Sequence, residues 1–168
     1  MLFLHLERGA DWATREDEGY TASTGVNVGI NIGPFCWSVQ FGASIDSKGN
    51  HVFQFTKNSG YVISTELGVG VTAGSYSTFT NASDAYALED AGLQIGGGAS
   101  VPIYNLPISF IAEENKVIIP NGTSSPYTGH SYYKGVTFPN SAEIHVQGSY
   151  SDTKNIWGFN ILDLFGVK

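Results

Sequence analysis

The sequence predicts an all-β protein: an antiparallel, Gly-rich β-barrel of about eight strands with one short helical insertion. Three observations predict this class. Apolar residues alternate strictly with small or polar residues over long runs, which is the period of a β-strand. These runs are separated by turns of hairpin length. Glycine contributes 21 of the 168 residues, and it recurs on one face of several runs, where it lets a sheet bend and close.

Charge separates a short amino-terminal segment from the rest of the chain. Residues 1–19 hold seven of the 23 charged residues, so they are expected to form a leader or linker. Residues 20–168 are expected to form one barrel domain, because this length suits a single core.

The alternation begins after Tyr20 and defines the first strands. One face carries Val26, Val28, Ile30 and Ile32, and the other carries Asn27, Gly29, Asn31 and Gly33. Residues 35–56 are predicted to form a hairpin around a turn at 46–50, where Gly49 is suited to a positive φ. A further turn at 58–60 is expected to precede a strand of up to fourteen residues, 61–74.

The alternation breaks at residues 80–91, which predicts the one helical insertion, with Asn81 or Ser83 as its N-cap. Beyond it we expect a strand at 93–95, a bend or bulge at 96–98, a strand at 99–104, a strand pair over 107–119 around a polar tip at 113–116, a loop over 120–140, a strand at 142–150, and an apolar strand or short helix at 156–165.

Alternation alone does not decide which face of the barrel meets water. A soluble barrel places the apolar face inside, whereas an outer-membrane barrel turns it toward lipid. The soluble arrangement is the favoured expectation, since residues 1–8 reach a charge too early to be a signal peptide. A soluble form that inserts later is consistent with both.

Composition and motifs exclude several classes of function. The net charge is −7 with only eight Lys and Arg, which argues against nucleic acid as a partner because phosphate contacts need a basic surface. The chain has no Walker-type, H-E-x-x-H, C-x-x-C or G-x-S-x-G motif, so neither a nucleotide, a cofactor nor a metal is expected. Cys36 is the single cysteine and has no partner for an internal disulfide.

A few residues are candidates for a site, although the sequence leaves open whether the protein is an enzyme. Glu66 interrupts a small-residue face. His130 lies in the predicted loop beside hydroxyl groups and a lysine, a setting for acid–base chemistry. Asp84 and Glu89 fall in the helical insertion, where carboxylates suit a hard cation. For a ligand-binding barrel, the expected lumen-lining residues are Trp37, Phe41, Phe53 and Phe55.

Several segments together resemble a known family. They are Gly68–Ser75, Thr80–Asp84, Leu88–Glu89, Ile95–Gly98 and, upstream, Asp46–Asn50. They resemble the all-β carboxyl-terminal modules of bacterial polymorphic toxins of the Rhs/YD-repeat type, in particular the group called bacterial toxin 23. The resemblance spans about residues 20–100.

The resemblance implies an effector of interbacterial competition, secreted as part of a larger toxin, that acts on a competitor or host cell, in one version at its membrane. It also implies an immunity protein as partner. It supplies no catalytic residues. Two alternatives remain open: an outer-membrane β-barrel and a soluble, lipocalin-like barrel that binds a small molecule.

Overall fold

The structure is a computed structural model that describes residues 19–66, 68–120 and 126–164. Its elements, in chain order, are β1 (Thr21–Ile32), β2 (Phe35–Asp46), β3 (Asn50–Ser64), β4 (Val69–Thr80), the 3-10 helix η1 (Ala85–Leu88), β5 (Asp90–Pro102), β6 (Ser109–Ile119), β7 (Tyr127–Phe138), β8 (Glu143–Asn160) and α2 (Ile161–Leu164). The predicted leader, apart from Gly19, lies outside the described residues.

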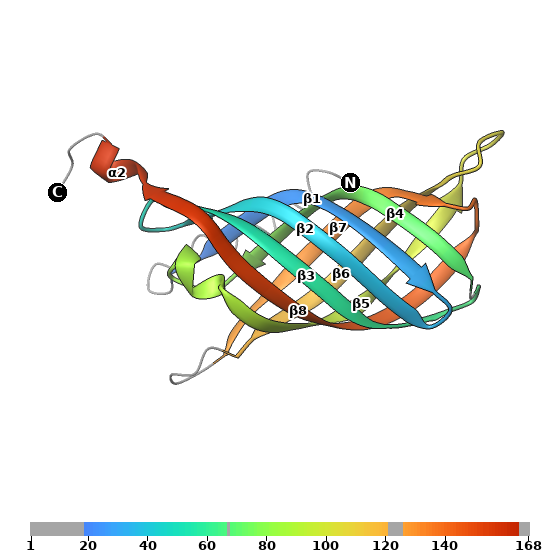
Figure 1. Ribbon diagram of the computed structural model, residues 1–168, viewed down its shortest axis with the longest axis horizontal. Helices are drawn as coiled ribbons and strands as arrows, with labels where there is room; N and C mark the ends of the chain where they lie inside the picture. Colours follow the sequence, from blue (N-terminus) through green and yellow to red (C-terminus); the bar gives the residue numbers. More distant parts are fainter. Residues whose placement is uncertain (1–18, 67, 121–125, 165–168) are drawn as a thin grey trace.

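The eight strands form one closed antiparallel barrel, which confirms the predicted fold class (Figure 1). The order around the barrel is β1-β2-β3-β8-β5-β6-β7-β4. It consists of two Greek keys, because β4 returns beside β1 and β8 returns beside β5. The connections β3–β4, β4–β5 and β7–β8 therefore cross an end of the barrel to strands that are not neighbours.

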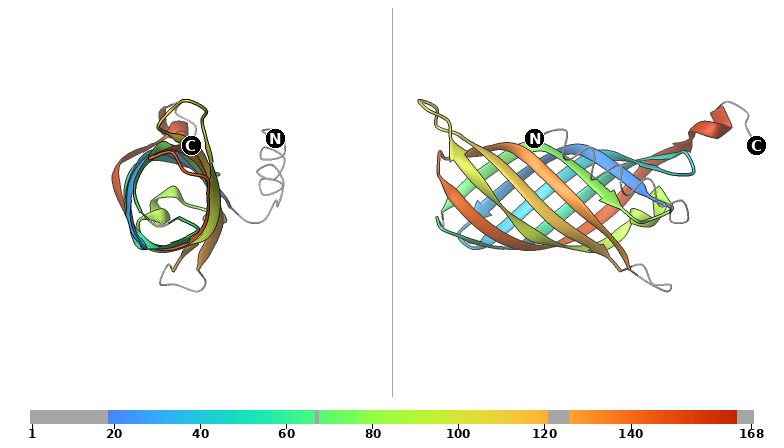
Figure 2. Two further views of the ribbon diagram at one scale, coloured as in Figure 1. Left: turned by 90° about the vertical axis from the view of Figure 1, so that its right-hand side faces the viewer. Right: turned by 180° about the vertical axis from the view of Figure 1, so that it is seen from behind.

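The two ends of the barrel differ. At one end, here called the η1 end, β1, β3, β5 and β7 begin, and α2 extends β8 beyond the barrel (Figure 1). The opposite end, here called the Pro34 end, carries the connections β1–β2, β3–β4, β5–β6 and β7–β8. A view into the barrel from the Pro34 end shows η1 across the far end (Figure 2).

The large apolar side chains point outward, whereas the favoured expectation placed the apolar face inside the barrel. Val26, Val28 and Ile30 of β1 are exposed, whereas most fully buried side chains are polar, among them Ser44 and Ser109. The interior of an eight-stranded barrel is only just wide enough for side chains to fill. The face of glycine, serine and asparagine therefore fits inside, and the bulky face remains outside.

Two tyrosines fill the middle of the lumen and require glycine at the inward positions close to their hydroxyl groups. Tyr76 and Tyr133 are buried together with Ile111. A Cβ at Gly42 would lie 2.4 Å from the Tyr76 hydroxyl, and one at Gly135 would lie 2.6 Å from the Tyr133 hydroxyl. Glycine at these positions thus makes room for the aromatic rings.

Several predicted elements were wrong in extent. The strand expected at 61–74 is divided between β3, which ends at Ser64, and β4, which begins at Val69, because the chain must cross the barrel end between them. The turn expected at 58–60 lies inside β3, where a Cβ at Gly60 would come within 2.2 Å of the Gly148 carbonyl oxygen. Alternation runs through both places and conceals the difference.

In the carboxyl-terminal half, the strand pair expected over 107–119 is the single strand β6, and the loop expected at 120–140 contains β7. Residues 96–98 form regular strand in β5, and the register shift lies at Phe53/Gln54 opposite β8. The helical insertion is confirmed as η1, but its cap is Asp84, whose side chain accepts a hydrogen bond from the Tyr86 N–H.

Candidate functional site

The outer surface carries a large set of exposed apolar side chains, here called the apolar belt. Its members come from all eight strands and are Val26, Val28, Ile30, Ile32, Phe35, Trp37, Val39, Phe41, Tyr61, Ile63, Val69, Val71, Leu93, Ile95, Val101, Phe110, Val136, Phe138, Ile144, Val146 and Tyr150. Soluble monomers rarely expose contiguous apolar patches larger than a few hundred Å². An exposed surface of this kind is typical of a protein that contacts lipid or another protein.

Aromatic rings gather on the outer surface near both ends of the barrel. Toward the Pro34 end, the centroids of the Phe35 and Trp37 rings lie 6.0 Å apart. Toward the η1 end, the Trp157 ring centroid lies 5.5 Å from that of Phe53 and 5.2 Å from that of Phe159. Two aromatic girdles flank the apolar band of membrane barrels, because aromatic side chains favour the interface between lipid and water.

The four aromatic residues expected to line a ligand-binding lumen lie on the outer surface instead. Trp37 is 44% exposed and Phe41 is 52% exposed. Phe41 pairs with Phe55 across the ladder, and Phe53 stacks on Trp157. Because side chains alternate along a strand, other residues occupy the inward positions of β3: the polar Gln54, Thr56 and Asn58, with Val52 and Val62 on either side of them. The expected aromatic lumen does not form.

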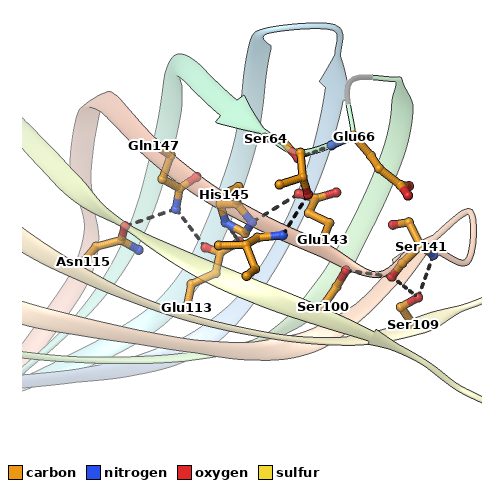
Figure 3. Close-up of polar contacts among 12 residues, drawn as sticks. Ser64, Glu66, Ser100, Ser109, Glu113, Asn115, Ser141, Glu143, His145 and Gln147 are labelled. Atoms are coloured by element: carbon orange, nitrogen blue, oxygen red, sulfur yellow. Dashed lines mark hydrogen bonds and ion pairs between the residues drawn. The ribbon is translucent and has the colours of Figure 1, made fainter.

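The lumen instead holds a polar cluster built from β6 and β8 (Figure 3). His145 is 4% exposed, and its Nε2 lies 3.3 Å from a Glu113 carboxylate oxygen, while its Nδ1 lies 3.1 Å from a Glu143 carboxylate oxygen. The Nδ1 contact has an ion-pair distance without hydrogen-bond geometry. Gln147 donates to Glu113 at 2.8 Å and to Asn115 at 3.1 Å. The cluster ties β6 to the start of β8.

This cluster is not among the sites expected from the sequence. Glu113 was expected at a polar tip, and no role was expected for His145. The alternation of Ser109, Ile111, Glu113 and Asn115, all on the inward face of β6, is the signal that could have found it. The partner on β8 follows only from the Greek-key pairing, which local patterns do not reveal.

The lumen is divided into small cavities. One of about 120 Å³ lies at the Pro34 end and is lined in part by Asn31, Glu66 and Glu143. Another of about 50 Å³ lies deeper, beside Asn58 and Tyr133. Ligand pockets usually measure about 300–1,000 Å³, so these cavities suit a few water molecules and not a lipocalin-type ligand.

The structure does not bring the predicted site residues together. Glu66 lies in the β3–β4 connection, beside the cavity at the Pro34 end. Asp84 caps η1, and Glu89 accepts a hydrogen bond from Asn155 at 3.0 Å. His130 is on the outer surface, and its Nδ1 lies 3.5 Å from a carboxylate oxygen of Glu114 on the neighbouring strand. Within the described residues, no three His, Cys, Asp or Glu side chains are placed to hold a metal ion.

The η1 end is closed by η1 and by the carboxylate of Asp46. Leu88 of η1 packs in an apolar cluster with residues of β6. Asp46 accepts hydrogen bonds from the backbone N–H groups of Lys48 at 2.8 Å, Asn50 at 3.0 Å and Ala85 at 2.9 Å. One buried carboxylate therefore fixes both the β2–β3 turn and the start of η1, at the rim and beyond the apolar belt.

Acidification is expected to loosen this closure. Burial alone would raise the pKa of Asp46, but the N–H donors outweigh burial and lower the pKa below its ordinary value of 3.8. A carboxyl group with a lowered pKa in the folded state stabilises the fold above the unfolded pKa, and this contribution is lost as pH falls through the folded pKa. Asp46→Asn should remove the loss of stability below about pH 4, measured by urea unfolding at pH 3 and pH 6. An unchanged pH dependence in this variant would contradict the assignment.

Comparison with models of known protein families, with curated proteins and with solved structures finds no match to this chain. Among the described residues, none of the helices has the length and apolar character needed to cross a membrane.

Proposed function

We propose that this chain is a membrane-embedded β-barrel, with its barrel axis across the bilayer. The observation that carries the proposal is the combination of an outward apolar belt with a polar, hydrogen-bonded lumen. In water, exposure of this belt is unfavourable by about 25 cal/mol for each Å² of apolar surface. Contact with lipid removes this cost.

A bilayer requires a hydrogen-bonded backbone as well as an apolar outer surface, and the barrel meets this requirement too. Lipid offers no hydrogen-bond partners, so a spanning structure must satisfy its N–H and C=O groups internally. All eight strands pair on both sides around the closed barrel. The Greek-key order differs from the up-and-down order of outer-membrane barrels, but lipid requires closure and not a particular strand order.

The lumen favours a structural or anchoring role over an open channel. Tyr76, Ile111 and Tyr133 fill its middle, and η1 closes one end (Figure 2). Polar side chains of neighbouring strands hydrogen-bond to one another, as Gln54 of β3 does to Asn155 of β8 at 2.8 Å. Narrow, filled interiors are typical of barrels with eight strands.

Flotation with lipid vesicles tests this proposal. The full chain, refolded with vesicles of phosphatidylcholine and phosphatidylglycerol, is expected to float with them and to remain bound after an alkaline carbonate wash. Without lipid or detergent it should aggregate. A chain that stays soluble and monodisperse in buffer, and that does not float, would overturn the proposal.

The role as an antibacterial or anti-host toxin module stays a prediction that rests on the resemblance. A membrane-embedded barrel is compatible with an effector that acts at the membrane of a target cell, and equally with a resident outer-membrane protein. Expression in bacteria separates the two. A toxin module should arrest growth and be neutralised by a co-encoded immunity protein, whereas a resident barrel should be tolerated.

A further inference from the structure

The outward face of β6 and β7 interrupts the apolar belt with a polar patch. The β6–β7 patch consists of Glu114, Lys116, His130, Tyr132 and Lys134. Ladder pairing places Lys116 beside His130 and Glu114 beside Tyr132. These two strands are the gold and orange strands at the front of the right-hand view of Figure 2.

The patch contrasts with most of the barrel. On β1, β2, β4 and β5, the outward side chains of the apolar belt are flanked by alanine, serine, threonine or glycine, and no charged side chain points outward within these strands. A cation on the lipid face costs about 2–4 kcal/mol near the midplane of a bilayer. Given the proposed membrane location, on which this inference rests, the patch is expected to be covered.

A smaller outward polar set lies on β3 and β8, and its charges are arranged to pair within one copy. It consists of Lys57, Asp152 and Lys154. Lys57 is the ladder partner of Asp152, and the Lys154 Nζ lies 3.8 Å from an Asp152 carboxylate oxygen. The β6–β7 patch is larger. Within one copy, Glu114 lies 3.5 Å from His130, but Ala112 is the ladder partner of Lys134, so this lysine has no acidic group directly opposite. The β6–β7 patch is therefore the better candidate for an interface.

We propose that a second copy of this chain covers the β6–β7 patch, related to the first by a two-fold axis parallel to the barrel axes. Two copies in one membrane share their orientation, which fixes the direction of this axis. The interface is then isologous, so that β6 of each copy faces β7 of the other. The patch contains both signs of charge, as a self-complementary surface requires.

The stagger of the strands identifies the residues that meet. Ladder partners of Val26 lead one way to Lys154 on β8, and the other way to Ile144, through Ser75, Lys134, Ala112 and Ala99. The two paths therefore reach β8 at positions ten residues apart. Divided over the eight strands of the barrel, this stagger is between one and two residues for each strand. A ladder partner on β6 thus lies between one and two residues closer to the Pro34 end than the residue at the same height along the barrel axis.

This shift places Glu114 level with Lys134. The ladder partner of Lys134 is Ala112, and the outward residue of β6 next toward the η1 end is Glu114. Across the two-fold axis, Glu114 of each copy consequently faces Lys134 of the other. The dimer therefore contains two such ion pairs, and the outward residue next to Lys134 toward the Pro34 end is the apolar Val136.

Charge reversal tests the pairing. The full chain in detergent micelles is expected to be a dimer by light scattering coupled to size-exclusion chromatography. Glu114→Lys and Lys134→Glu should each raise the dimer dissociation constant by about tenfold or more, because like charges then meet twice. The double variant should restore the dimer. Lys57→Glu, on the outward face of β3, is the matched control and should leave the dimer unchanged.

Flotation of the wild type and of every variant distinguishes failure of the dimer proposal from failure of the membrane proposal. A wild-type chain that floats but is monomeric in micelles and in vesicle cross-linking overturns the dimer and leaves the membrane proposal standing. A dimer that survives both single reversals, or that the double variant fails to restore, also overturns it. The milder Glu114→Gln variant, which removes the charge without reversing it, should weaken the dimer even if the reversed variants do not fold.

Discussion

Val28→Arg is expected to prevent stable insertion of the barrel into vesicles. Val28 is 50% exposed and lies in the middle of the outward face of β1, between Val39 of β2 and Ala73 of β4. An arginine on the lipid face near the midplane costs about 2–4 kcal/mol. That is a large share of the stability of a small domain, usually about 5–15 kcal/mol. Flotation and urea unfolding in the presence of vesicles measure the effect.

Ser47→Arg is the matched control for this variant. Ser47 is exposed in the turn between β2 and β3 at the η1 end, so the same side chain is added where it remains in water. We expect this control to float like the wild type and to change the free energy of unfolding by less than about 0.5 kcal/mol. Equal behaviour of the two variants would contradict a lipid-facing belt.

Local alternation was sufficient to predict the fold class but not the direction of its faces. The run from Val26 to Gly33 reads identically whether its apolar face is inside or outside. Which face lies inside depends on how much volume the closed barrel encloses. The rings of Tyr76 and Tyr133 fit inside only because glycine stands close to their hydroxyl groups, at Gly42 and Gly135, so the enclosed volume is too small for the whole bulky face.

The candidate site depended on information that no local pattern contains. Glu113 and His145 meet because β8 inserts between β3 and β5, a pairing set by the Greek-key crossings at the barrel ends. Likewise, the alternation predicts a strand through Glu66, because it continues on both sides of the β3–β4 connection. Residues far apart in sequence share a site only once the strand order is known.

His145→Ala is expected to destabilise the barrel by roughly 3 kcal/mol, at the low end of the range for breaking a buried pair. The loss leaves Glu113 and Glu143 without the imidazole that separates them. Their side chains are 14% and 18% exposed, so water retains some access to both carboxylates and the cost stays below that of a fully buried charge. Urea unfolding of the micelle-bound chain, followed by tryptophan fluorescence, measures it.

His51→Ala provides the comparison on the outer surface. The His51 ring stacks on Phe159 with centroids 5.0 Å apart, and loss of such a contact costs about 1 kcal/mol. Glu113→Gln keeps a hydrogen-bonding side chain against His145, so its effect should fall between the two alanine variants. If His145→Ala is no more destabilising than His51→Ala, the cluster does not hold β6 and β8 together, and the lumen is stabilised by the packing around Tyr76 instead.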